Sequence, residues 1–193
     1  MSDRLLLIEI FRHTGLSSEN LKTVVDSFKQ VSFKKNDYVL EEGQTANEYF
    51  FIESGFMRSF VRDIKGNDIT TAFYSSKALV LEVSSFFLRI PTKENIQALT
   101  DCICWKISFE EFQTLFHQME GFREAGRKRL VNGYSSLKQR SLSMITETAD
   151  VRYLQLLKEH PEVFKYAPLK YIATYLGITD TSLSRIRKEL VRK

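Results

Sequence analysis

The sequence contains few cysteines, histidines and tryptophans and no long apolar run, and each shortage excludes a class of protein. Its 193 residues include 2 Cys, 3 His and 1 Trp. No apolar run approaches the roughly 20 residues that a membrane-spanning helix needs. The opening segment, MSDRLLLIEIFRH, lacks the basic start, long apolar stretch and cleavage site of a signal peptide. We therefore expect a cytoplasmic protein with no membrane partner.

The two cysteines, Cys102 and Cys104, lie two residues apart, which places both side chains on one face of a strand. That geometry is awkward for a disulfide between them, and two ligands are too few for a closed zinc or iron–sulfur site. Free cysteine is among the most buried residue types. We expect two reduced core residues, with no metal and no cofactor.

The charges are unevenly distributed along the chain, whose net charge is +4. Residues 121–193 carry 15 Lys and Arg against 7 Asp and Glu, net +8, whereas residues 1–120 carry 13 against 17, net −4. This division predicts a basic C-terminal module that meets a polyanion, joined to an N-terminal module that need not. The alternative is two solvated surfaces of different sign.

Apolar periodicity predicts a short helix followed by a β-rich region. Residues 16–29 place apolar side chains at helical spacing, with Ser17 or Ser18 as the cap. From about Val31 to Ser108, short runs rich in Phe, Val, Ile and Tyr are separated by turn signals roughly ten residues apart. That spacing predicts an antiparallel barrel or sandwich.

Two helices are predicted after the β-rich region, over residues 109–117 and 121–145. The longer helix carries a narrow apolar seam at spacings of four, three and seven, the pattern of two helices packed against each other. The seam consists of Leu130, Tyr134, Leu137 and Met144. This chain's own barrel could also cover it, but we expect the helix of a second copy, and thus a homodimer.

A further helix and a helical hairpin are predicted near the C-terminus. After a hinge at residues 146–150, apolar residues at Val151, Leu154 and Leu157 predict a compact helix that ends before Pro161. The segment YIATYLGITDTSLSRIRKEL, residues 171–190, then has the pattern of two helices joined by a tight turn.

The sequence predicts a structural role for several residues of this hairpin. Pro168 suits the start of the first helix, Gly177 supplies the turn, and Thr179 can cap the second helix. The residues expected to face inward are Leu169, Ile172, Ala173, Leu176, Leu183, Ile186 and Leu190. Those expected on the exposed face are Thr181, Ser184, Arg185, Lys188 and Arg192. A helix with such a face fits the DNA major groove, where arginine can bond guanine and Ser or Thr can reach bases or phosphates.

The chain resembles the cyclic-AMP receptor protein and FNR (Crp/Fnr) superfamily of bacterial transcription regulators. TADVRYLQLLKEHPE and PLKYIATYLGITDTSLSRIRKEL are especially similar to its short Bacteroidetes-type members. EEGQTANEYFFIESGFMRSFV resembles the family's β-roll segment, with its turn at Glu42-Gly43 and its strand glycine at Gly55.

The resemblance implies an α+β fold. Its parts are an N-terminal antiparallel β-roll (a double-stranded β-helix, cyclic-nucleotide-binding-like) with flanking helices, a long dimerisation helix, and a C-terminal helix-turn-helix domain. The corresponding boundaries are residues 1–118 for the β-roll sensor, 119–146 for the dimerisation helix and hinge, and 147–193 for the DNA-binding domain.

The resemblance also implies partners and contact residues. The partners are double-stranded DNA with a two-fold symmetric operator, a second copy of the chain, RNA polymerase as a further candidate, and a small-molecule effector of unknown identity. The DNA-binding residues that it implies are Lys170, Thr179, Asp180, Thr181, Ser182, Ser184, Arg185 and Lys188.

The predicted effector segment, LEVSSFFLRIPTKEN, departs from the family pattern. Relatives that bind cyclic nucleotides have Gly-Glu and, ten residues after the Glu, Arg-Ser or Arg-Thr, whereas this sequence has Leu81-Glu82 and Thr92-Lys93. Lysine is a poorer phosphate fork than arginine, and a leucine adds bulk where the backbone must approach the ligand. We expect that cyclic AMP is not bound tightly, although Lys93 or Arg89 could compensate, and that a retained pocket takes a more apolar effector. The residues expected at this pocket are Leu81, Glu82, Val83, Thr92 and Lys93.

The alternative is a cupin-type β-roll enzyme, or a small-molecule-binding protein with a helical appendage. Metal-dependent cupins gather His and carboxylate ligands around one ion. However, His13, His117 and His160 all lie outside the β-rich region, and the sequence shows no Ser-His-Asp arrangement or Gly-rich phosphate loop. We therefore favour a DNA-binding regulator that is not an enzyme.

Overall fold

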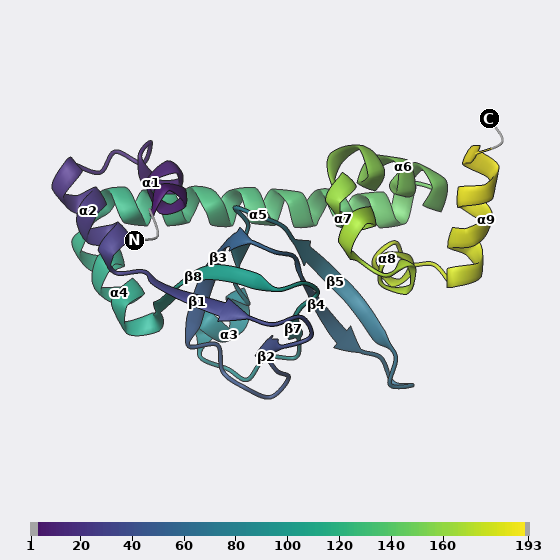
Figure 1. Ribbon diagram of the computed structural model, residues 1–193, viewed down its shortest axis with the longest axis horizontal. Coiled ribbons are helices and arrows are strands. Elements are labelled where there is room, and N and C mark those ends of the chain that lie inside the picture. The colour runs from purple at the N-terminus through teal and green to yellow at the C-terminus, as the bar shows by residue number, and fades with distance from the viewer. Residues whose placement is uncertain (1–3, 192–193) are drawn as a thin grey trace.

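The computed structural model describes residues 4–191 and is organised around one long helix. This helix, α5 (Glu120–Thr146), runs along the molecule with a β-roll on one side of it (Figure 1). Helices α1, α2 and α4 surround its N-terminal end, and α6 to α9 gather at its C-terminal end. None of the helices within residues 4–191 is long and apolar enough to cross a membrane.

The β-roll consists of two four-stranded antiparallel sheets. The first has the order β1-β8-β3-β6, formed by Lys29–Phe33, Cys102–Ser108, Glu48–Ser54 and Leu79–Val80. The second has the order β2-β7-β4-β5, formed by Tyr38–Leu40, Asn95–Ala98, Met57–Arg62 and Asp68–Tyr74. The predicted α+β fold with an antiparallel β-roll is confirmed.

Aromatic packing joins the first sheet to the helices beside it. These are α1 (Leu5–Phe11), α2 (Ser18–Asp26) and α4 (Phe109–Gln118). The ring of Phe11 lies 5.8 Å, centroid to centroid, from the rings of Phe28, Phe51 and Phe122. Ser17 caps α2 by accepting a hydrogen bond from the backbone N–H of Asn20 at 3.1 Å, as one of the two predicted caps. A continuous aromatic core therefore connects the roll to α5.

Three short helices were not predicted from the sequence. They are α1, α3 (Val83–Leu88), which interrupts the region expected to be all β, and α7 (Pro161–Tyr166), which follows the proline that ends the preceding helix. The carboxylate of Glu82 caps α3 by accepting hydrogen bonds from the backbone N–H groups of Ser84 and Ser85. Six residues between strands are too few for helical periodicity to stand out, so α3 had no clear signal.

Both cysteines and Gly55 have packing reasons for their positions. Cys102 and Cys104 are free and buried, as expected. Gly55 lies just after β3, in the connection to β4, rather than inside a strand. Its φ is +108°, and a Cβ there would be 2.5 Å from Cys102 Sγ and 2.6 Å from the Asp101 carbonyl oxygen. Only glycine satisfies both constraints.

The C-terminal helices form a second core. They are α6 (Ala149–Glu159), α7 (Pro161–Tyr166), α8 (Leu169–Tyr175) and α9 (Asp180–Val191). Pro161 ends α6 as predicted and occupies the first turn of α7, where its missing N–H costs nothing. The residues of α6 buried in this core are Tyr153 and Leu156. The three apolar residues that predicted this helix, Val151, Leu154 and Leu157, are exposed instead.

Helix α8 packs against strand β5 of the roll, so the two cores are in contact (Figure 1). Phe56 and Leu99 of the roll belong to the C-terminal core. The guanidinium carbon of Arg58 on β4 lies 3.5 Å from the ring centroid of Tyr171 on α8, and its Nη2 donates to Asp68 at 2.6 Å. The backbone N–H of Thr70 donates to the Thr174 hydroxyl at 3.2 Å. The helical hairpin is therefore held directly on the roll.

Candidate nucleic-acid interface

Helices α8 and α9 form the predicted hairpin around a tight turn. Ile172, Ala173 and Leu176 are buried as expected, but Leu169 is 42% exposed, because it is the first residue of α8 and lies at the rim of the core. Gly177 has φ +70°, and a Cβ there would lie 2.5 Å from Met144 Cε at the end of α5. The turn therefore favours glycine for its backbone angle, and any larger residue would also displace the Met144 methyl group.

Hydroxyl groups cap the start of α9. The backbone N–H of Ser182 donates to the Thr179 hydroxyl at 3.2 Å, which confirms the predicted cap. The Thr179 hydroxyl also lies 2.8 Å from that of Thr181 and donates to that of Ser182 at 3.0 Å. Three of the eight predicted DNA-binding residues are thus linked in one network, and half-buried Ser182 is the least accessible of them.

The rest of the α9 face is exposed and basic. Leu183 and Ile186 are buried, so the opposite side of the helix faces outward. Five predicted residues line one shallow hollow on that side: Asp180, Thr181, Ser184, Arg185 and Lys188. Within residues 4–191, Arg185 and Lys188 make no ion pair or side-chain hydrogen bond, so both cations are available to an anion.

Two other cations flank this face. Lys170 on α8 is exposed, and its Nζ lies 5.0 Å from the ring centroid of Tyr171. Arg187, which the sequence prediction left out, is also exposed on α9. Arg192, predicted to lie on the exposed face, is outside the described residues. The helix-turn-helix arrangement therefore presents several cations around one helix.

The predicted seam of α5 is exposed along this chain. Leu130, Tyr134, Leu137 and Met144 are 41%, 70%, 59% and 39% exposed. Packing on the chain's own roll therefore does not bury Tyr134 or Leu137. The end of the Met144 side chain lies beside the hairpin turn at Gly177, so the seam reaches the C-terminal helices.

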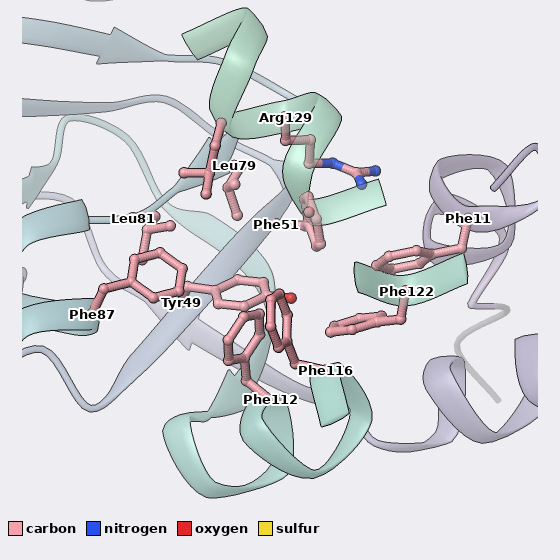
Figure 2. A pocket seen from close by; sticks show the side chains of 12 residues that line it. Phe11, Tyr49, Phe51, Leu79, Leu81, Phe87, Phe112, Phe116, Phe122 and Arg129 are labelled. Carbon is pink, nitrogen blue, oxygen red and sulfur yellow. The ribbon is translucent and has the colours of Figure 1, made fainter. Parts of the chain in front are cut away.

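The five predicted effector residues have different structural roles. Glu82 caps α3, and the Thr92 hydroxyl accepts a hydrogen bond from the backbone N–H of Glu94 at 2.9 Å. Lys93 and Val83 are exposed, whereas Leu81 packs against the main core. Leu81 also lines an aromatic cavity between α5 and the first sheet, together with Tyr49, Gly126 and Arg129 (Figure 2).

The cations that could have replaced the missing phosphate-binding arginine are used elsewhere or point outward. Arg89 donates to the carbonyl oxygen of Ala46 at 2.7 Å and lies 4.1 Å from the Phe109 ring centroid. Lys93 is exposed. Glu94 faces this region instead: burial raises its pKa, hydrogen bonding to Thr71 opposes the rise, and Glu82 adds to it. The raised pKa means that the surroundings of Glu94 disfavour a negative charge.

The described residues hold no group of three or more His, Cys, Asp or Glu close enough to share a metal ion. His13 and His117 are exposed, and His160 Nδ1 lies 3.7 Å from a Glu162 carboxylate oxygen. Within residues 4–191, the histidines that a metal-dependent cupin would use as ligands are therefore not gathered around one point.

Comparison with known proteins identifies the β-roll and the overall fold. The cyclic nucleotide-binding domain family matches residues 30–119. The cAMP-dependent protein kinase regulatory subunit of Candida albicans is 24% identical over 105 residues, which are 54% of this chain and 22% of that protein. The chain thus spans about a fifth of that curated relative's length.

Two solved structures cover nearly the whole chain. A protein from Eubacterium rectale, described as a transcriptional regulator of the crp/fnr family, has a TM-score of 0.72 at 17% identity, covering 92% of this chain and 85% of its own. FixK2 from Bradyrhizobium japonicum has a TM-score of 0.71 at 18% identity, covering 86% and 85%. Residues 30–119, just under half of the chain, therefore match the cyclic nucleotide-binding domain family, and the chain as a whole has the fold of these two solved structures.

Proposed function

We propose that this protein is a sequence-specific DNA-binding transcriptional regulator. The observation that carries the proposal is the outer face of α9, where Ser184, Arg185 and Lys188 are exposed and the two cations have no partner within residues 4–191. An α-helix with such a face fits the major groove, and cations beside it neutralise phosphates. The solved structure from Eubacterium rectale, which has a similar fold and is described as a transcriptional regulator of the crp/fnr family, supports the proposal of a DNA-binding regulator.

We further propose that two copies act together through α5. The exposed seam from Leu130 to Met144 would be buried against the same seam of a second copy. A two-fold dimer would place two α9 helices about one DNA turn, ~34 Å, apart, so its site would be an inverted repeat. The three-part division at residues 118/119 and 146/147 belongs to the same proposal; α4 ends at Gln118 and α5 at Thr146.

Unbiased selection of DNA sequences by the purified protein tests the proposal. We expect recovered sites to contain an inverted repeat with half-sites about one turn apart. Sedimentation at micromolar concentration should show a dimer. Selected sites without two-fold symmetry, together with a purely monomeric protein, would contradict the dimeric mode of binding; recovery of no enriched sequence would contradict the DNA-binding function itself.

We propose that cyclic AMP is not the effector. The family's phosphate-binding pair is replaced by Thr92-Lys93, whose cation is exposed, and burial raises the pKa of Glu94 beside it, as expected where negative charge is disfavoured. Losing two charge-assisted hydrogen bonds of about 1.5–3 kcal/mol each would weaken binding at least a hundredfold. Calorimetry with cyclic AMP and cyclic GMP should show no tight binding. Micromolar affinity accompanied by stronger DNA binding would refute this part of the proposal.

A further inference from the structure

The last four backbone carbonyl groups of α8 have no partner within the helix, so other groups must satisfy them. The backbone N–H of Gly177 donates to the Thr174 carbonyl oxygen, and that of Ile178 donates to the Ala173 carbonyl oxygen, both at 3.0 Å. Because Gly177 also has φ +70°, these two bonds form a Schellman motif. The backbone of the turn therefore satisfies two of the four carbonyl groups and leaves the last two to other partners.

Two arginines from outside the hairpin bind the remaining carbonyl groups, those of Tyr175 and Leu176. Arg140 on α5 donates from Nη2 to the Tyr175 carbonyl oxygen at 3.0 Å, and its guanidinium carbon lies 4.3 Å from the centroid of the Tyr175 ring. Arg152 on α6 donates from Nη2 to the Leu176 carbonyl oxygen at 2.9 Å. Both arginine side chains are half-buried. The end of α8 is therefore capped by side chains of two other helices.

Arg152 also bridges the junction between α5 and α6, residues 146–150, which the sequence predicts as a hinge. Its Nη1 donates to the Glu147 carbonyl oxygen at 2.6 Å. The Glu147 carboxylate accepts hydrogen bonds from the hydroxyl of Ser143 on α5 and from Nε2 of Gln155 on α6, the second at 3.2 Å. Because the terminal nitrogens of a guanidinium are held in one plane, Arg152 keeps the end of α5 and the end of α8 at a set separation.

Helix α5 reaches the hairpin at two successive turns. Arg140 and Met144 are four residues apart and lie on the same face of α5. The methyl carbon of Met144 lies 2.5 Å from the position that a Cβ of Gly177 would take. Helix α9 begins at Asp180, just after this turn, in the group of helices at the C-terminal end of α5 (Figure 1). The direction of α9 relative to α5 therefore depends on these contacts.

We propose that Arg140 and Arg152, the arginine pair, are positioning residues that set the half-site spacing of the operator. This inference rests on the proposed function, since it requires two copies joined through α5 and two α9 helices on one DNA. A two-fold axis repeats the angle between α5 and α9 in both copies, so freedom in that angle changes the separation of the two α9 helices twice over.

DNA geometry makes this separation selective. One additional base pair moves a half-site by ~3.4 Å along the DNA and rotates it by ~34° around the axis. A dimer whose α9 helices are held rigidly on α5 cannot follow both changes, so it rejects operators that are one base pair too short or too long. A dimer with loosely held α9 helices accepts them.

The arginine pair acts on spacing and not on base sequence. Neither arginine lies on α9 or lines its hollow, and both side chains end on backbone carbonyl oxygens. The exposed face of α9 reads the bases of each half-site, whereas the arginine pair fixes where the second half-site must be.

Binding titrations against a set of operators test the inference. The operators keep the half-site sequence that the wild-type protein selects and differ in separation, from two base pairs shorter to two longer. The wild type should bind operators one base pair away from the optimum at least ~10-fold more weakly. In Arg140→Met and Arg152→Met this preference should fall to ~3-fold or less, because methionine cannot donate to a carbonyl oxygen.

A merely structural role would lower the affinity for every operator by the same factor and leave the spacing preference unchanged. Lys158→Met is the matched control for charge, since Lys158 is exposed on α6; it should at most weaken all operators equally. Arg140→Lys keeps one donor and should retain the preference. Arg152→Lys lacks the planar fork that bridges two carbonyl oxygens, so it should lose the preference.

Circular dichroism and sedimentation show whether each variant is a folded dimer, and the contrast between the two lysine variants decides if a methionine variant does not fold. An unchanged spacing preference in folded Arg140→Met and Arg152→Met, equal behaviour of the two lysine variants, or a wild type that tolerates a one-base-pair change would overturn the inference and leave DNA binding intact. A wild type that selects no inverted repeat would refute the proposed dimeric function, and this inference with it.

Discussion

Arg185 is the side chain of α9 best placed to read a base. It is exposed, has no partner within residues 4–191, and lies in the hollow shared with Ser184 and Lys188. Arg185→Ala should cost about 1–3 kcal/mol at the specific site and relax preference at one base pair per half-site. Repeating the sequence selection with the variant measures this; an unchanged consensus would argue against base contact by Arg185.

Lys170 should behave differently, because it is an exposed cation in the first turn of α8 and does not lie on α9. Lys170→Ala should weaken binding to all sequences about equally and reduce the slope of log K against log salt by about one. Binding titrations at several salt concentrations separate the two effects. A change in sequence preference without a change in slope would contradict a phosphate contact.

Glu94 should make the protein's stability depend on pH. Burial raises its pKa in the folded state, so stability is greatest below the unfolded pKa and falls as pH rises through the folded pKa. Glu94→Gln cannot ionise and should therefore be more stable than the wild type at neutral pH, with little difference below about pH 4. Urea unfolding at both pH values measures this, and the exposed Glu41→Gln is the control.

Residues whose role depends on neighbours in sequence were predictable, and those that depend on distant partners were not. Thr179 was identified as a cap because a hydroxyl residue stands just before the second helix, and its hydroxyl accepts a hydrogen bond from the backbone N–H of Ser182. Tyr49 and Arg129 gave no signal, because 80 positions separate two residues that the fold brings to one cavity. Glu94 was missed for the same reason, since Thr71 and Ser59 come from other strands.

At the level of elements, periodicity located helices better than it located their buried faces. Helix α6 was predicted from Val151, Leu154 and Leu157, yet Tyr153 and Leu156 are the residues that pack inward. This helix has apolar side chains on more than one face, so spacing alone could not choose between them. The choice is made by Phe164 on α7, whose ring lies 5.2 Å from that of Tyr153.

The seam of α5 gives a prediction for dimerisation. Leu137 is 59% exposed in the single chain and lies near the middle of the seam. Leu137→Glu would bury two carboxylates at a two-fold interface, so we expect the dimer to dissociate at micromolar concentration while the monomer stays folded. Sedimentation and circular dichroism measure the two properties.

Ser135→Glu provides the matched control, since Ser135 is exposed on the side of α5 opposite Leu137. It adds the same charge to the same helix and should leave the dimer intact. If both variants dissociate the dimer equally, added charge rather than the seam is responsible. If neither does, the seam is not the interface.

At the scale of the whole molecule, the helical hairpin is docked on the roll through Arg58. This side chain is 1% exposed and lies between the rings of Phe60 and Tyr171, at 3.9 and 3.5 Å from their centroids. A desolvated cation over an aromatic ring contributes about 2 kcal/mol. Tyr171→Leu should therefore loosen the docking and speed hydrogen exchange in α8 and β5 together.

Phe164→Leu separates docking from simple loss of stability. Phe164 packs on Tyr153 within the C-terminal core, so its truncation should destabilise α6 and α7 without increasing exchange in β5. Equal exchange in β5 for the two variants would contradict a specific role for the Arg58–Tyr171 contact. The docking itself was not predictable, because Arg58 and Tyr171 lie in different predicted domains and nothing in either local pattern indicates the other.

The length of α5 turns small movements into large ones. From Gly126 at the cavity to Met144 at the hairpin turn, the helix rises ~27 Å at 1.5 Å per residue. A tilt of about 5° around the cavity end would displace Met144 by ~2 Å, and Met144 lies directly beside the hairpin turn at Gly177. A small change in the angle of α5 near Gly126 would therefore become a displacement of the hairpin relative to the roll.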